Sequence, residues 1–296
     1  MGASQSHALY GTTKPQLQSQ KSPFLLNVLK SNGPAQAALT AAEAADNYRA
    51  RCAAERLNAS ARDNQVYAAG RMSEEEYDRH SNYLFTLAPY LSTELKELGT
   101  VDVAYLMPSA DGGMPHTRPR SLICFPLSAS PTTMETLSHE LWHIHQRLQK
   151  ERWHRFLENR WNFVPYKGAL PDKLRSALRF NPDTLETPLW VWRDEWVPVC
   201  IFTNPTTPTF KDTAVWYYNT KRKYYVTTAP AAYLDMFGRS LPSAAYEHPY
   251  ELAAYMLSLQ HRSRCPAFRL LFGEFGNAAD TSASTSVSTS KEESNE

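Results

Sequence analysis

The sequence predicts an α+β fold in which helices accompany a small mixed β-sheet and a second, aromatic and β-rich region. Three observations indicate it. An amphipathic helix is expected at Thr132–Arg147, and two β-branched, apolar runs, 101–107 and 121–125, precede it as strands. Segments rich in tryptophan, tyrosine and valine follow between residues 189 and 228. With 296 residues, 42% of them hydrophobic, the chain can bury a substantial core.

Two helical segments are expected before these strands. The first, Ala35–Arg62, is rich in alanine, the residue with the highest helix propensity. The second, Ser73–Leu98, begins with a serine that can cap it, and the acids Glu74–Glu76 suit the positive end of the helix dipole. Neither segment carries a pattern that points to chemistry, so we interpret both as scaffold helices.

The composition divides the chain into three parts. Residues 1–34 are expected to form a flexible arm and residues 35–275 a single folded domain. Residues 276–296 consist mainly of Ser, Thr, Ala and acids, which predicts a disordered tail. Within the arm, Pro23–Leu29 is a small apolar cluster that can dock on the domain.

The N-terminus carries a short lipidation pattern. Its first six residues, M-G-A-S-Q-S, fit the N-myristoylation signal, with Gly2 as the acceptor and Ser6 at the key position. The first 42 residues contain three lysines and no acid, so the arm is weakly cationic. One acyl chain with a few lysines gives a modest affinity for a membrane surface. The alternative is an ordinary, unmodified terminus.

Charge, cysteine content and hydropathy indicate which partners and which cellular compartment to expect. A formal net charge of +1 gives no reason to expect nucleic-acid binding. Four scattered cysteines without a C-x-x-C pair favour free thiols in a reducing compartment. No apolar run reaches the roughly 18 residues of a transmembrane helix, and no signal-peptide core is present. We therefore expect a cytoplasmic protein, peripheral on the cytoplasmic face of a membrane if Gly2 is acylated.

The segment T-T-M-E-T-L-S-H-E-L-W-H-I-H-Q-R has the features of a capped helix. Thr132 and Glu135 fit a capping box. Apolar residues spaced by four, three and four form one stripe, made of Leu137, Leu141, Ile144 and Leu148. No glycine or proline occurs from Met134 to Phe163, so the helix can continue through that whole stretch.

Two histidines lie on one face of this helix. His139 and His143 are four residues apart, so their imidazoles project from the same side, close enough to share a cation. Imidazole is a good Zn²⁺ ligand, and Glu140 can accept a proton from a metal-bound water. H-E-x-x-H on a helix is the pattern of zinc peptidases, in which the glutamate is the general base. The alternative is a helix that carries two histidines by chance.

Between the two predicted strands lies a turn-rich loop, Ser109–Arg120. Its residues His116 and Arg118 either face a cleft or are simply exposed, as loop residues usually are. The second strand, Ser121–Phe125, is the last one before the helix. Because zinc peptidases usually place a strand above the active-site helix, we expect this strand to pair with an extended substrate by its edge.

The region after the helix is expected to be mainly β-structure. Pro171–Leu178 is predicted as a short helix, and Leu189–Phe202 as two strands separated by residues 193–195. Thr213–Asn219 and Lys223–Thr228 are predicted as a hairpin. We interpret the tyrosines and tryptophans of this region as packing groups, and the basic turn of the hairpin as a solvated tip.

A catalytic zinc ion usually takes three protein ligands, so the two histidines need a third donor. His145 lies about 200° around the helix from His143 and points away from the pair. Glu158 lies roughly 22 Å along a continuous helix and comes within reach only if that helix ends early.

The better candidate is on a helix expected at Tyr246–Leu257. Pro249 fits its first position and His248 its cap, which puts Glu251 in the first turn. Two alanines that follow permit close packing against the first helix. Glu251 is therefore the favoured third ligand, with Glu247 and His248 as the leading substitutes. The alternative is a first-turn glutamate that only stabilises the helix dipole.

These segments together resemble a known group of enzymes. H-E-L-W-H on a capped helix with a distant glutamate in H-P-Y-E-L-A-A-Y is similar to the gluzincin zinc metallopeptidases. With M-P-H-T-R-P added, the combination also resembles predicted metallopeptidases of large DNA viruses and unicellular eukaryotes, over residues 101–259. The resemblance implies a zincin-like fold, Zn²⁺ on His139, His143 and Glu251, and Glu140 as the base.

The expected function is zinc-dependent hydrolysis of a peptide or protein substrate, with Glu140 passing a proton to the leaving amine. Tyr246, Tyr250 or His116 is expected to donate a hydrogen bond to the developing oxyanion. One alternative is an inactive, myristoyl-anchored interaction protein. The other is a protein with a structural zinc ion, closed by a fourth ligand such as His248.

Overall fold

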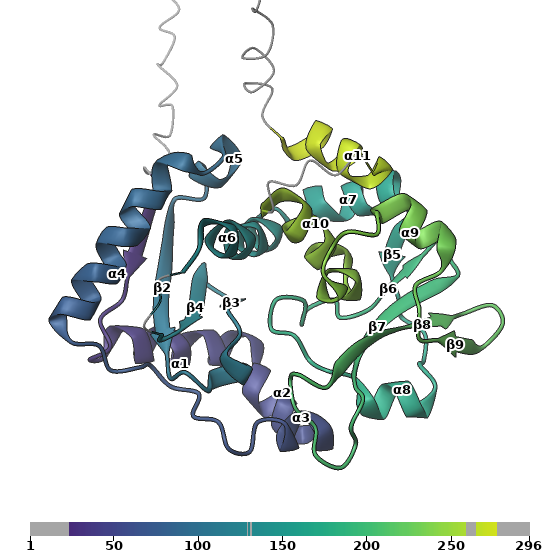
Figure 1. The fold of residues 1–296 in the computed structure, drawn as a ribbon, viewed down its shortest axis with the longest axis horizontal. Helices are drawn as coiled ribbons and strands as arrows, with labels where there is room; N and C mark the ends of the chain where they lie inside the picture. The colour runs from purple at the N-terminus through teal and green to yellow at the C-terminus, as the bar shows by residue number, and fades with distance from the viewer. Residues whose placement is uncertain (1–23, 129, 131, 259–264, 277–296) are drawn as a thin grey trace, which may run out of the picture.

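The computed structural model describes residues 24–128, 130, 132–258 and 265–276, and this part of the chain contains eleven α-helices and two β-sheets (Figure 1). The α+β class is therefore confirmed. Gly2 and residues 277–296 of the expected tail lie outside the described residues. None of the described helices combines the length and apolar character that crossing a bilayer requires.

The first sheet is mixed and has four strands. Their spatial order is β1 (Leu25–Val28), β2 (Thr100–Leu106), β4 (Leu122–Pro126) and β3 (His116–Arg118). The first three are parallel to one another, and β3 is antiparallel to β4. β1 lies inside the segment expected to be a flexible arm, so the apolar cluster found there docks as a strand of the sheet.

The strand predicted to present a free edge to substrate is an interior strand. β4 lies between β2 and β3, so both of its edges are paired. The edge is β3 instead, which forms within the segment predicted as a loop. Arg120 and Ser121 have left-handed backbone conformations, with φ of 66° and 53°, and reverse the chain so that β3 folds back onto β4.

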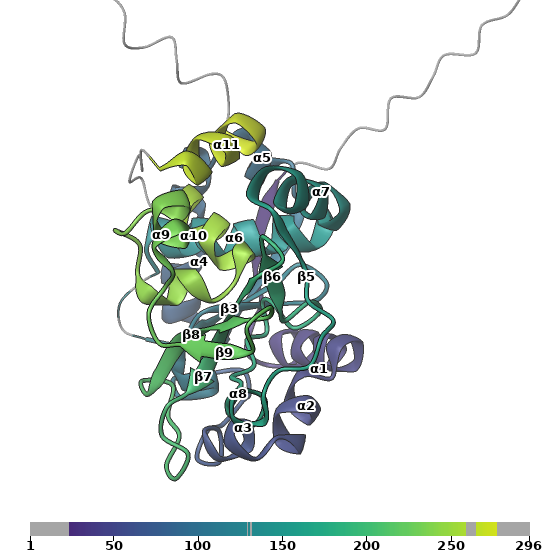
Figure 2. The same ribbon diagram turned by 90° about the vertical axis from the view of Figure 1, so that its right-hand side faces the viewer.

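The alanine-rich segment forms three helices instead of one. They are α1 (Pro34–Asp46), α2 (Tyr48–Ala54) and α3 (Arg56–Ser60), at the end of the molecule away from α11 (Pro266–Phe275; Figure 2). The chain turns at Asn47, where φ is 52°, and again at the extended residue Glu55. Asparagine tolerates the left-handed region better than most residues. The turns direct Asp46 and Tyr48 to buried partners, Arg118 and Asp111.

The second predicted helix is shorter than expected. α4 (Glu74–Leu87) starts with the predicted cap, since Ser73 accepts the Glu76 N–H and the Glu76 carboxylate accepts the Ser73 N–H. It ends before Pro89, whose ring is incompatible with the preceding turn. Three short helical turns follow: η1 (Ala88–Tyr90), α5 (Thr93–Lys96) and η2 (Ala110–Gly113).

The helix with the two histidines is α6 (Met134–Leu148). Its cap is Thr133, one residue later than predicted, and the Thr133 hydroxyl accepts the Thr136 N–H at 3.2 Å. With Thr133 as the cap, Glu135 is not at the position that a capping box requires. The predicted apolar stripe is buried except for Leu148, which is 53% exposed at the helix end.

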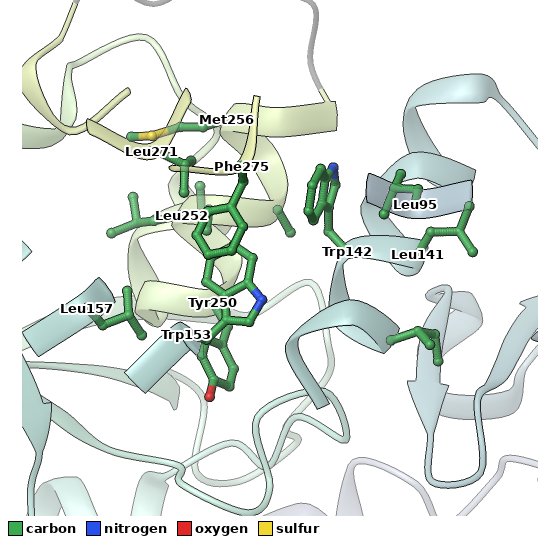
Figure 3. Close-up of a cluster of buried hydrophobic side chains, with 14 of the residues drawn as sticks. Leu95, Leu141, Trp142, Trp153, Leu157, Tyr250, Leu252, Met256, Leu271 and Phe275 are labelled. Atoms are coloured by element: carbon green, nitrogen blue, oxygen red, sulfur yellow. The ribbon is translucent and has the colours of Figure 1, made fainter. Parts of the chain in front are cut away.

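The long helix that the sequence allows through residue 163 does not form, because α6 ends at Leu148 and the chain changes direction at Gln149. α7 (Lys150–Trp161) then folds back on α6, so that Trp153 donates to Nδ1 of His145 at 2.9 Å. Trp153 also stacks on Phe275 of α11, with 3.9 Å between ring centroids (Figure 3). Burial of these large rings stabilises the broken arrangement over a continuous, solvated helix.

The second sheet is antiparallel and has five strands. In spatial order they are β5 (Phe163–Pro165), β6 (Trp190–Trp192), β7 (Trp196–Phe202), β8 (Thr213–Asn219) and β9 (Tyr224–Val226). The predicted strand pair and hairpin are confirmed, as is the short helix, α8 (Asp172–Ala177). The chain continues through α9 (Ala231–Phe237), η3 (Ser243–Glu247) and α10 (Pro249–Ser258). α6 and α10 pack against each other between the two sheets (Figure 1).

The sequence left two alternatives for Arg118, a side chain that faces a cleft and one that is exposed to solvent. Both are wrong. Its guanidinium is fully buried and bonds Asp46 at 2.6 and 2.9 Å and Glu43 at 2.8 Å. It also donates to the Tyr67 hydroxyl at 2.7 Å. This network connects α1, through Glu43 and Asp46, to the edge strand β3.

We expect Arg118→Met to lower the free energy of unfolding by about 3–5 kcal/mol, because it leaves the Asp46 carboxylate buried without its cation. Urea denaturation measures the loss. Arg120→Met, at an exposed arginine two residues away, is the matched control and should change the stability by less than about 0.5 kcal/mol. Equal losses in both variants would contradict the role of the network.

Candidate metal centre

α6 and α10 bring His139, His143 and Glu251 together. The two Nε2 atoms are 3.0 Å apart, and Oε2 of Glu251 lies 3.2 Å from His139 Nε2 and 3.5 Å from His143 Nε2. A tetrahedral zinc ion with bonds of about 2.0–2.1 Å separates neighbouring donors by roughly 3.4 Å. The three atoms therefore have the spacing of three corners of such a tetrahedron, and the residues form a group that could hold a metal ion.

The local sequence explains how each ligand is placed. The imidazoles of α6 lie one above the other, with centroids 4.7 Å apart, as residues four apart on a helix should. His248 caps α10, because its Nδ1 accepts the Tyr250 N–H at 3.1 Å. Ala253 and Ala254 are fully buried, and their small side chains let α10 approach α6 closely enough for Glu251 to reach the histidines.

A glutamine fixes the orientation of His143. Nδ1 of His143 lies 2.7 Å from Oε1 of Gln146, and Nε2 of Gln146 donates to the Tyr250 carbonyl at 3.0 Å. Because the amide oxygen only accepts, His143 carries its proton on Nδ1 and leaves Nε2 free for a metal ion. The sequence analysis missed Gln146, although its place three residues after a ligand, on the same helix face, was a usable signal.

The orientation of Glu251 is also fixed by a hydrogen bond, which its Oε1 accepts. Asn181 donates to Oε1 of Glu251 and to Oε1 of Glu247, each at 2.8 Å. Glu247 also accepts two bonds of 2.6 Å from Arg179. Oε2 of Glu251 is thereby left to face the imidazoles. Glu247, one of the two predicted substitutes, is paired with Arg179 and is not part of the metal group.

The other predicted substitute, His248, has both ring nitrogens engaged. Nδ1 accepts the Tyr250 N–H, and Nε2 lies 2.8 Å from the Thr187 carbonyl. His145 points away from the ligand pair, as predicted, and lies against Trp153. Glu158 is exposed on α7, so the early end of α6 does not bring it to the site.

The buried histidine and glutamate of this group shift each other's pKa values. Burial by itself lowers the pKa of His143, but the carboxylates of Glu251 and Asp183 outweigh it and raise that pKa to about 10. Burial raises the pKa of Glu251, but attraction to the two histidines outweighs it and brings that pKa well below its ordinary value. The three groups thus form an environment that favours a positive charge between them.

Glu140 lies beside this group, with no hydrogen bond on one of its oxygens within the described part of the chain. Its side chain is 3% exposed, and its Oε2 has no hydrogen bond to any described residue. Burial and the nearby carboxylate of Asp183 raise the pKa of Glu140 well above its ordinary value. Most buried polar atoms are hydrogen-bonded, so this oxygen calls for a functional explanation.

A cavity of about 440 Å³ opens next to the metal group. His139, Glu140 and Glu251 line it, together with residues of β3, β7, β8 and η3. Asp183 forms part of the wall near Glu140. A substrate group in this cavity would therefore lie next to His139, Glu251 and Glu140 at once.

The predicted oxyanion donors are not well placed. Tyr246 and Tyr250 are not among the residues that line the cavity, and the Tyr246 hydroxyl donates to the Gly238 carbonyl at 2.8 Å. His116 does line the cavity, but its ring nitrogens lie 2.7 Å from the Tyr67 hydroxyl and 3.0 Å from the Met114 carbonyl.

A tyrosine that the sequence analysis passed over is better placed. Tyr255 lines the cavity, and its ring lies edge-on to His139, with 4.5 Å between centroids. Its hydroxyl makes no hydrogen bond to another described residue. Tyr255 follows Glu251 by four positions, so it shares the helix face of a predicted ligand, and that spacing was the signal for it.

Comparisons of the chain with protein-family models, with curated proteins and with solved structures found no match in any of the three. The gluzincin resemblance and the zincin-like fold therefore stay predictions, and function has to be inferred from the geometry of the site.

We expect the purified protein to bind about one equivalent of zinc and His143→Ala to lose most of it, because two remaining donors hold the ion weakly. Metal analysis after dialysis measures both. His154→Ala removes a histidine of α7 outside the group and should keep the wild-type content. Retention of zinc by His143→Ala would show that the ion binds elsewhere.

Proposed function

We propose that this chain is a zinc-dependent peptidase in which His139, His143 and Glu251 hold the metal ion and Glu140 is the general base. The observation that carries the proposal is Glu140, which lies beside the ligand group and lines the cavity, and whose buried Oε2 has no hydrogen bond to any described residue. Such an oxygen lowers stability, so its retention is typical of a catalytic role.

The donor set fits a catalytic zinc ion better than a structural one. Structural zinc is bound by four protein ligands, whereas catalytic zinc takes three, often two histidines and a glutamate. Among the described residues the group has three members, and both nitrogens of His248, the expected fourth ligand, are engaged elsewhere. When bound, zinc supplies a Lewis acid and lowers the pKa of a water in its fourth position towards neutrality.

Glu140 carries out the proton transfers, and Tyr255 supplies a hydrogen bond. Oε2 of Glu140 accepts the proton of the attacking water and delivers it to the leaving amine. Burial raises the pKa of Glu140, which makes its carboxylate a stronger base for the first of these transfers. The hydroxyl of Tyr255 donates a hydrogen bond to the developing oxyanion.

Two side chains orient the metal ligands for this chemistry. Gln146 holds the tautomer of His143, and Asn181 holds the rotamer of Glu251. Groups of this kind tune metal affinity and ligand basicity. The motif resemblance to gluzincins agrees with the proposal.

We expect Glu140→Gln to lower the rate of peptide cleavage by about 10²–10⁴-fold and to keep its zinc, because the amide cannot accept the proton. A mixture of internally quenched peptides and metal analysis measure the two properties. Glu158→Gln, at an exposed glutamate of α7, is the control and should keep full activity. Undiminished cleavage by Glu140→Gln would refute the assigned base, whereas a wild-type protein that binds no zinc and cleaves no peptide would favour an inactive interaction protein.

We expect Tyr255→Phe to lower kcat by about 10²-fold with a small change in KM, because the ring against His139 remains and the hydroxyl is lost. Tyr246→Phe is the matched control, since that hydroxyl bonds Gly238 and does not face the cavity. A loss in KM alone, or equal effects in the two variants, would remove Tyr255 from the mechanism.

A further inference from the structure

The sheet edge nearest to α6 is already occupied. Thr117, the middle residue of β3, donates its backbone N–H to Oδ1 of Asp183 at 2.7 Å. Its carbonyl accepts from Nη2 of Arg147 at 3.3 Å. An extended substrate needs such backbone groups to be free, because strand addition consists of hydrogen bonds to them. β3 is therefore a poor partner for substrate.

A second edge faces the same cavity, at the start of β8. β7 pairs with β8 along its whole length, from Thr213 to Asn219. On the other side, β9 pairs only with residues 217–219. No described strand pairs with that side of residues 213–216, so the first half of β8 is an edge.

The alternation of the strand shows which backbone groups lie on this edge. The Asp212 carbonyl accepts the Thr203 N–H at 2.8 Å, and the Thr220 N–H donates to the Glu195 carbonyl at 2.7 Å. Both contacts are on the β7 side, and successive residues alternate between the two sides. Ala214 therefore faces β7, whereas Thr213 and Val215 direct their N–H and C=O groups to the open side.

This edge belongs to the cavity of the metal group. Residues 213–215 line it together with His139 and Glu140. Residues 213–216 are each partly exposed, so a ligand can reach them. In Figure 1, β8 lies with β7 across from β3 and α6.

We propose that substrate binds as an extended peptide added to the edge of β8 at Thr213–Val215, an inference that rests on the proposed peptidase function. The outward N–H and C=O groups of Thr213 and Val215 give up to four hydrogen bonds to the peptide backbone. Backbone bonds of this kind do not depend on side-chain identity. The substrate class is therefore an unfolded or flexible segment of protein, held with low sequence selectivity, and not a folded surface.

Amide hydrogen exchange tests this directly. The probe is a mixture of end-blocked hexapeptides of random sequence, added to the zinc-loaded Glu140→Gln protein so that the peptides stay intact. We expect exchange at Thr213 and Val215 to slow at least about tenfold, as newly hydrogen-bonded amides do. Ala214, already bonded to β7, should be slow with and without peptide and serves as the internal control.

Two variants in the active protein add a kinetic test. Val215→Pro removes an outward N–H and leaves the bonds to β7 intact, so we expect KM for the peptide mixture to rise about tenfold with zinc content unchanged. Val215→Ala keeps the N–H and should raise KM much less than Val215→Pro does. If Val215→Pro does not fold, the exchange measurement alone decides.

The outcomes separate the two proposals. If peptides are cleaved but protection appears at Thr117 and not at Val215, the edge of β8 is wrong and the peptidase stands. The same holds if Thr213 and Val215 are already slow before peptide is added, because another segment of the chain then covers the edge. If the zinc-loaded wild-type protein cleaves none of the peptides and Glu140→Gln binds none, the proposed function itself fails.

Discussion

The carboxylate of Glu251 and the imidazoles of His139 and His143 attract one another where α6 and α10 pack together, and all three side chains are largely buried there. Each of these groups would be costly to bury alone, and their mutual contact offsets much of that cost. The contact requires α10 to lie close against α6, which Ala253 and Ala254 permit. Folding that aligns the two helices therefore also assembles the metal group.

Around the cavity, most carboxylates have a cation of their own. Asp111 is paired with Arg62, Glu247 with Arg179, and Asp183 lies 4.0 Å from Arg147 while accepting from Thr117. Glu140 is different, because one of its oxygens is buried and makes no hydrogen bond to the residues that the structure describes. The electrostatic arrangement thus separates carboxylates that hold the fold together from one that is available for proton transfer, although all of them are buried.

Two of the errors in the expected secondary structure share one physical cause. No glycine or proline interrupts Ala35–Arg62 or Met134–Phe163, so the sequence predicts one helix for the first segment and allows one for the second. The chain nevertheless turns at Asn47, where Tyr48 reaches a buried aspartate, and at Gln149, where Trp153 reaches the aromatic cluster of α11. Helix propensity amounts to tenths of a kcal/mol per residue, whereas burial of one large ring contributes about 1.5–3 kcal/mol, so tertiary contacts decide where these helices end.

The sequence by itself determined the features that depend on short-range spacing. The pairing of His139 with His143, the cap of α4, the hairpin of β8 and β9 and the first turn of α10 all follow from residues within a few positions of one another. Only the tertiary structure decided that Glu251 meets those histidines, that Gln146 and Asn181 orient the ligands, and that β3 is closed while β8 is open. Those contacts join residues far apart in the chain, and no local pattern specifies which of several distant partners will be packed together.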